Sequence, residues 1–165
     1  MSINGRKISQ LTVICLILFG IVAGCAQTPS RASKEERERV VSALDEMYKR
    51  YVSGSVMEAR SNLVKAVTVM HENSGRIPEL QTGLPMGYAR LSLLERKAGF
   101  EAISRIYFEK SRYWRIIEFE RSGQKPDEII SNHDSVSRED SDKAALDWDI
   151  NYTKGVGPAY LKELR

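Results

Sequence analysis

Two histidines, His71 and His133, carry the imidazole groups that could act as a base or bind a metal. His133 lies in a polar segment between Asp127 and Asp134, and carboxylates beside an imidazole are ligands for a divalent metal. The segment lacks the D-x-[DN]-x-[DN]-G spacing of a calcium loop, so we predict no metal site from it. His71 falls at the predicted end of a helix, where a cation interacts favourably with the helix dipole. We therefore predict a structural role for His71.

No arrangement of residues identifies a catalytic centre. The chain has no G-x-S-x-G, H-E-x-x-H or P-loop sequence, and Ser92 and Ser104 have no histidine near them in the sequence. Aspartates are frequent near the C-terminus, but paired carboxylates do acid–base work only where burial separates their pKa values. These observations favour a protein that is not an enzyme and that uses no cofactor. A small hydrolase or metal-dependent enzyme that uses the 127–134 segment is an alternative.

One basic and aromatic cluster offers a different chemistry, the stacking of a ligand on aromatic rings. It consists of Arg112, Tyr113, Trp114 and Arg115. Glu109 and Glu118 dilute the positive charge around it, and the two rings fall on the predicted buried stripe of a helix. We therefore predict core packing for Tyr113 and Trp114. The alternative is a ligand or partner surface, in which these rings line a groove for peptidoglycan fragments or lipids.

The thiol of Cys25 is the most informative reactive group, because the residues before it have the pattern of an export signal. Arg6 and Lys7 form a basic start, and an apolar stretch from Leu11 to Ala23 follows. Thirteen helical residues span ~20 Å, well short of the ~30 Å hydrocarbon core of a bilayer. The short apolar stretch, the basic flank and the small residues before Cys25 predict a signal peptide over residues 1–24.

The sequence Val22-Ala23-Gly24-Cys25 resembles the lipobox of bacterial lipoprotein precursors. That resemblance implies cleavage before Cys25, lipidation of its thiol and new amino group, and attachment to a membrane. Several acyl chains anchor a protein more firmly than one, because each buried methylene contributes about 0.8 kcal/mol. Ala26 stands where the family's inner-membrane retention signal has Asp, which implies the outer membrane, facing the periplasm, in a cell that has one. The alternative is an ordinary secretory signal with an incidental cysteine.

Composition excludes several classes of protein. The chain has 25 Lys and Arg against 22 Asp and Glu, and the predicted leader takes two of the basic residues, so the mature part is nearly neutral. Bulk charge therefore gives no reason to expect nucleic acid as a partner. Cys15 lies in the leader and Cys25 is assigned to lipid, which leaves no cysteine for a disulfide. We expect packing alone to stabilise the mature domain.

The mature chain divides into a tether and one helical domain. Residues 25–33 are small and polar and predict a flexible tether, whereas residues 34–165 predict a single α-helical domain. Two S-x-x-E capping boxes, at Ser33 and Ser55, begin the first two helices, which should pack as an antiparallel hairpin. Gly54 between them is predicted to end the first helix in the left-handed conformation.

Further helices are predicted along the rest of the domain. A loop over 76–85 leads to a third helix, with Pro85 in its first turn. A fourth, longer helix begins at Phe100 and is apolar over much of its circumference, which predicts that it is the central helix. A polar loop over 123–136 precedes a helix that Ser137 caps, and a last turn follows. No period-two pattern indicates a strand, so the predicted fold class is all-α.

Residues 87–115 resemble a tetratricopeptide hairpin, in which two short helices cross at small residues with a glycine at the turn. Gly99, Phe100 and Ala102 match the turn and the start of the second helix, and Glu109 stands where the family has a later alanine. The resemblance implies stacked helical hairpins. Because independent arrays need about three repeats, a compact bundle is the alternative to a short array.

These patterns together favour a lipid-anchored cell-envelope protein with a helical domain. The membrane is its first expected partner, through the lipid on Cys25, and another envelope protein is the second. We expect a protein-interaction or scaffold role rather than catalysis, because the sequence offers anchor and helices but no catalytic motif.

Overall fold

Helices make up the regular structure in the computed structural model of the protein, which describes residues 30–123 and 136–164. In chain order they are α2 (Lys34–Ser53), α3 (Val56–Asn73), the 3₁₀ helix η1 (Pro78–Gly83), α4 (Leu84–Lys97), α5 (Glu101–Arg121), α7 (Arg138–Tyr152) and the 3₁₀ helix η2 (Ala159–Lys162). The described residues contain no strand, so the predicted all-α fold is confirmed, and the five α-helices pack as a small bundle.

Both predicted capping boxes are present. The Ser33 hydroxyl accepts a hydrogen bond from the Glu36 amide at 3.2 Å, and the Glu36 carboxylate accepts one from the Ser33 amide at 2.8 Å. Ser55 and Glu58 make the same reciprocal pair at the start of α3. Each box satisfies two amides that a helix N-terminus otherwise leaves without partners. The two helices can therefore follow each other after a break of two residues.

Gly54 corrects one prediction about that break. Its φ is −85°, which is extended backbone, so the predicted left-handed end of the first helix is wrong. A Cβ on Gly54 would lie 2.7 Å from the Arg50 carbonyl oxygen and 2.8 Å from the Glu58 Cβ. Glycine is thus required here for space, because the end of α2 and the start of α3 crowd the position.

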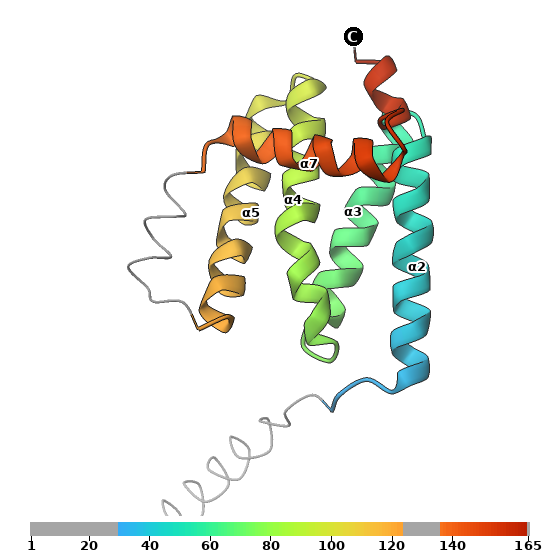
Figure 1. Cartoon of the computed structure of the whole chain (residues 1–165), viewed down its shortest axis with the longest axis vertical. Coiled ribbons are helices and arrows are strands. Elements are labelled where there is room, and N and C mark those ends of the chain that lie inside the picture. The colour runs from blue at the N-terminus through green and yellow to red at the C-terminus, as the bar shows by residue number, and fades with distance from the viewer. Residues whose placement is uncertain (1–29, 124–135, 165) are drawn as a thin grey trace, which may run out of the picture. The chain divides into compact units, whose positions relative to one another are not determined.

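The second hairpin is formed by α4 and α5. The predicted loop over 76–85 contains η1, and Pro85 lies in the first turn of α4 as predicted. Gly99 has a φ of +84° in the turn that follows α4, a conformation that side chains with a Cβ rarely adopt. Figure 1 shows α2, α3, α4 and α5 standing side by side.

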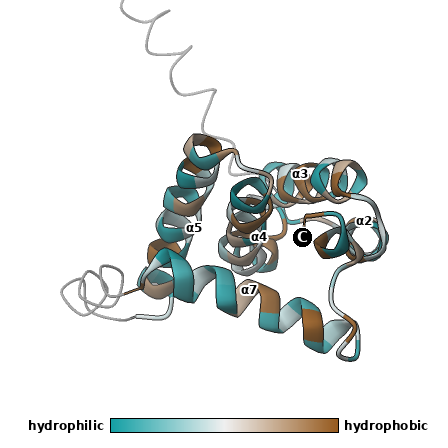
Figure 2. Cartoon of the chain, turned by 90° about the horizontal axis from the view of Figure 1, so that it is seen from above, coloured by the Kyte–Doolittle hydropathy of each residue, from teal (hydrophilic) through white to brown (hydrophobic). Residues whose placement is uncertain are grey.

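Helix α7 lies across this row of helices (Figures 1 and 2). Ser137 caps it as predicted, because its hydroxyl accepts the Asp140 amide at 3.1 Å. The fully buried Ala145 packs against Ala89 and Leu93 of α4. A small side chain at this contact lets α7 approach α4 closely, so the crossing helix closes one side of the bundle.

The prediction that the fourth helix is central is wrong, because α4 holds that place. Every residue of α4 from Leu84 to Glu95 except Met86 is buried, whereas α5 buries Ser104 and Ser111 alone. The main core draws its buried side chains from α2, α3, α4 and η2: Tyr51, Val52, Ala59, Leu63, Val67, Leu84, Tyr88, Leu91, Leu94 and Tyr160.

The buried serines of α5, Ser104 and Ser111, explain why its hydropathy pattern wrongly predicts a central position. The Ser104 hydroxyl donates to the Ser92 carbonyl at 2.7 Å, and the Ser111 hydroxyl donates to the Pro85 carbonyl at 2.7 Å. Small polar side chains thus make the buried part of the contact between α5 and α4. Tyr107 and Trp114 of α5 also pack against the main core but are only partly buried, whereas Ile106 is 56% exposed.

Several predictions fall on residues outside the described ranges. The leader over 1–24, Cys25 and the 127–134 segment with His133 are among them. The described residues from Arg31 onward belong to one compact unit. Within the described residues, no helix combines the length and apolar character that crossing a membrane requires.

Candidate functional site

Asp149 of α7 is the centre of a buried polar cluster that joins four elements. Its side chain has no exposed surface. The Tyr48 hydroxyl donates to Oδ1 at 2.6 Å, Arg90 Nε donates to the same oxygen at 2.8 Å, and the Tyr51 hydroxyl donates to Oδ2 at 2.6 Å. The hydroxyls of Tyr51 and Tyr160 lie 3.1 Å apart. The cluster therefore ties α2, α4, α7 and η2 together.

The chemistry of this cluster is structural. Burial raises the pKa of Tyr51 well above its ordinary value of 10 and raises the pKa of Tyr160 to about 12, so both hydroxyls stay protonated. Each carboxylate oxygen of Asp149 accepts at least one hydrogen bond, and the Arg90 guanidinium balances its charge. A base or nucleophile needs an oxygen that is open to a substrate. Asp149 is instead used to hold the helices.

An apolar groove of about 490 Å³ lies beside the cluster and opens to solvent. Its lining comes from α2, α3, η1, α4 and α7: Leu44, Tyr48, Leu63, Ala66, Met70, Thr82, Gly83, Met86, Gly87, Arg90 and Trp148. Tyr48 and Arg90 belong to both the groove and the cluster. Most of the lining is apolar, with few polar groups, which is the usual make-up of a binding site in a protein.

Trp148 and Gly87 show how the sequence builds this groove. Trp148 is 59% exposed although its neighbour Asp149 is fully buried, so the buried aspartate fixes the backbone that presents the indole. A Cβ on Gly87 would lie 2.8 Å from Val67 Cγ2. Glycine at this position allows α4 to lie close to α3 and leaves the space above them open.

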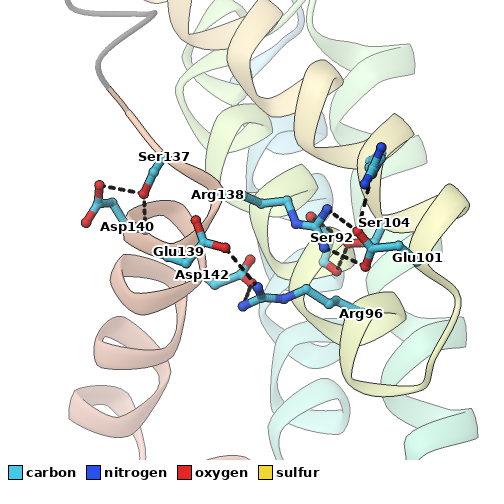
Figure 3. A network of polar contacts seen from close by, with 10 residues as sticks. Ser92, Arg96, Glu101, Ser104, Ser137, Arg138, Glu139, Asp140 and Asp142 are labelled. Carbon is cyan, nitrogen blue, oxygen red and sulfur yellow. Dashed lines mark hydrogen bonds and ion pairs between the residues drawn. The ribbon is translucent and has the colours of Figure 1, made fainter.

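A second polar network joins α4, α5 and α7 (Figure 3). Arg96 forms ion pairs with Asp142 and, at 3.4 Å, with Glu139. Arg138 reaches Glu101 through two hydrogen bonds of 2.6 and 2.7 Å. Burial raises the pKa of Asp142, and Arg96 opposes that rise. The network pins the start of α7 to the end of α4 and the start of α5, so it orients the crossing helix.

Glu101 leads to a prediction about acid. Hydrogen bonds from Arg138 lower the pKa of Glu101 from 4.5 to about 2, and cap hydrogen bonds also lower the pKa values of Glu36 and Glu58. Groups with lowered pKa values stabilise the fold above about pH 4.5, and that stability is lost as the pH falls toward 2. The pKa of Asp142 is raised, so the contribution of this group to stability increases as the pH falls.

The melting temperature, followed by circular dichroism, should therefore fall between about pH 5 and pH 2. Glu101→Gln should make this fall shallower, because the glutamine cannot be protonated. A melting temperature that stays constant or rises over this range would contradict the assignment, as would a Glu101→Gln variant with the same pH dependence as the native protein.

The residues of the basic and aromatic cluster, Arg112, Tyr113, Trp114 and Arg115, differ in their exposure to solvent. Trp114 packs against the main core, and its ring lies 5.4 Å from that of His71. Tyr113 is 57% exposed, so the predicted core position holds for Trp114 and is wrong for Tyr113. Arg112 pairs with Glu109 at 3.4 Å, and Arg115 is half-buried. His71 lies in the last turn of α3, where the sequence predicted a helix end.

Sequence reasoning missed Arg90 and Asp149. One signal was present for Arg90, because it interrupts the apolar run from Tyr88 to Leu94 on a helix predicted to pack. A charge in such a run needs a buried partner of opposite sign. The sequence has too many aspartates near the C-terminus for that partner to be chosen without a structure.

Among the described residues, no group of three or more histidine, cysteine, aspartate and glutamate side chains is arranged to hold a metal ion. The chain matches none of the protein-family models, curated proteins or solved structures with which it was compared. The groove and its supporting cluster are therefore the features from which a function has to be argued.

Proposed function

We propose that this is a lipid-anchored cell-envelope protein whose helical domain binds an amphipathic helix of another envelope protein. The observation that carries the binding role is the groove of about 490 Å³, with Trp148 exposed at its edge. An amphipathic helix places its apolar face into such a groove through residues spaced three and four apart.

The side chains of the groove favour a protein partner. Met70 and Met86 line it, and methionine side chains adapt to partners of varied shape. Trp148 and Tyr48 add aromatic surface, and aromatic residues and methionine are enriched where proteins meet. Arg90 contributes to the lining with its charge already balanced by Asp149, so it does not require an acidic ligand.

The location is supported by the sequence of residues 1–25. A basic start, a short apolar stretch and a cysteine after small residues resemble a lipoprotein signal. In a cell with an outer membrane, Ala26 favours that membrane and its periplasmic face. A tethered domain searches the membrane surface, where the effective concentration of partners is raised.

A photo-crosslinking residue at position 148 of the full chain tests the binding role in cells. We expect a discrete protein adduct whose crosslinked segment, mapped by mass spectrometry, is an amphipathic helix. The matched control places the same residue at Lys143, which is exposed on α7 and does not line the groove. That position should give no such adduct.

Two arginine substitutions on α2 sharpen the test. Leu44→Arg places a charge in the groove lining and should reduce the adduct about tenfold or more, because a charge without a partner is costly to bury. Val41→Arg lies one turn earlier at a side chain that is 55% exposed, so it should leave the adduct unchanged. The proposal fails if position 148 gives no adduct, if Leu44→Arg has no effect, or if the crosslinked molecule is a lipid.

A further inference from the structure

The outer face of α5 has large apolar side chains without a described partner helix. The main packing of α5 is against α4 and η1, and Figure 2 shows α5 at one end of the row of helices. On this face Ile103 is 36% exposed, Ile106 is 56% exposed and Tyr113 is 57% exposed. These three residues follow one another at spacings of three and seven, so they share a stripe along the helix.

A shallow hollow marks the middle of the stripe. It is lined by Arg105, Ile106, Glu109, Lys110 and Tyr113. The ammonium group of Lys110 lies 5.6 Å from the centre of the Tyr88 ring, so this side chain turns toward α4. The lining of the hollow thus combines the apolar surface of Ile106 and Tyr113 with the charged groups of Arg105 and Glu109.

A row of charged residues along α5 that includes Arg105 and Glu109 alternates in sign. Glu101, Arg105, Glu109 and Arg112 follow one another at spacings of four, four and three residues. From the N-terminal end of α5 the signs of these charges are negative, positive, negative and positive, and from the C-terminal end they are positive, negative, positive and negative. Two copies of α5 that pack antiparallel would thus face each other with opposite charges. The central pair is accessible for this, because the side chains of Arg105 and Glu109 are 74% and 64% exposed.

We propose that the α5 face is the interface of a homodimer with twofold symmetry, in which two α5 helices pack antiparallel. Arg105 of each copy lies opposite Glu109 of the other, and the axis passes at the level of residue 107. Symmetric pairs of this kind are the commonest oligomers, and their interfaces must be self-complementary. This inference does not depend on the proposed function, since it uses a different face from the groove.

The size of the face sets the strength that we expect. A helix of 21 residues is about 31 Å long, and one helix face is smaller than the ~800 Å² per partner of a standard interface. The dimer should therefore be reversible rather than permanent. Its formation should depend on the concentration of the protein.

Two differently tagged full-length copies, expressed together and recovered from a detergent extract of whole cells, test the interface by co-isolation. Native copies should co-isolate. Arg105→Glu in both copies should reduce recovery about tenfold, because two attractive pairs become two repulsive ones. Glu109→Arg in both copies should have the same effect. Arg105→Glu in one copy with Glu109→Arg in the other should restore recovery, because opposite charges face each other again.

A matched charge reversal controls for unrelated effects. Arg39→Glu disrupts an exposed i,i+4 pair with Glu35 on α2, away from α5, and should leave co-isolation unchanged. The proposed dimer is overturned if native copies do not co-isolate. It is also overturned if Arg105→Glu has no effect, or if the combination of Arg105→Glu with Glu109→Arg fails to recover.

Discussion

Arg90→Met is expected to destabilise the domain by about 3–5 kcal/mol, which is a large part of the stability of a small domain. The side chain of Asp149 has no exposed surface, and the substitution leaves its carboxylate buried without a positive charge. Two tyrosine hydroxyls still donate to it, but they do not neutralise it. Chemical denaturation of the purified protein, followed by circular dichroism, measures the loss.

An exposed ion pair provides the matched control. Arg37 lies 2.9 Å from Glu79, which is nearly the distance between Arg90 and Asp149. Both side chains of the Arg37–Glu79 pair, however, are substantially exposed. Arg37→Met should therefore change the stability by less than about 1 kcal/mol. The double substitution Arg90→Met with Asp149→Asn should recover part of the loss, because neither charge is left alone. An Arg90→Met variant as stable as Arg37→Met would show that the buried cluster does not hold the fold.

Local signals in the sequence were sufficient for the helices and most of their ends. Ser33 with Glu36 and Ser55 with Glu58 predicted two helix starts, because a cap involves residues only three apart. Pro85 predicted the first turn of α4 for the same reason. Each of these sequence patterns acts through a hydrogen bond or a φ angle within a single helical turn, so a short stretch of sequence is enough to predict it.

The order of burial among the helices could not be predicted in this way. Helix α5 carries more aromatic residues than α4, but its buried residues are Ser104 and Ser111, which donate hydrogen bonds to carbonyls of α4. Helix α4 buries Arg90 and Glu95, whose partners are Asp149 and Arg60. Those partners come from other helices, so hydropathy along a single helix does not reveal them.

The candidate site could be predicted even less well, because its residues also come from different helices. The groove draws its lining from five elements, and residues such as Leu44 and Trp148 are more than one hundred positions apart. The sequence singled out Trp114, which packs in the core, because an aromatic residue on a helix stripe has the same pattern whether it faces a core or a ligand.

Cys25→Ser is expected to have the largest effect on the proposed role. The resemblance to lipoprotein precursors implies that the thiol of Cys25 accepts lipid, and a serine hydroxyl does not replace a thiol as the acceptor. The variant should stay uncleaved or be mislocalised, and it should carry no lipid. Fractionation of cells, with the protein detected in membrane and soluble fractions, measures this change. The helical domain itself should still melt cooperatively, because neither lipid nor disulfide contributes to its core.

The intact mass of the mature native protein, isolated from membranes, tests the proposed anchor most directly. The account predicts a chain that begins at Cys25, lacks residues 1–24 and carries the added mass of acyl chains at its first residue. Recovery of the mature protein in the soluble fraction with no mass added at Cys25 would contradict the account.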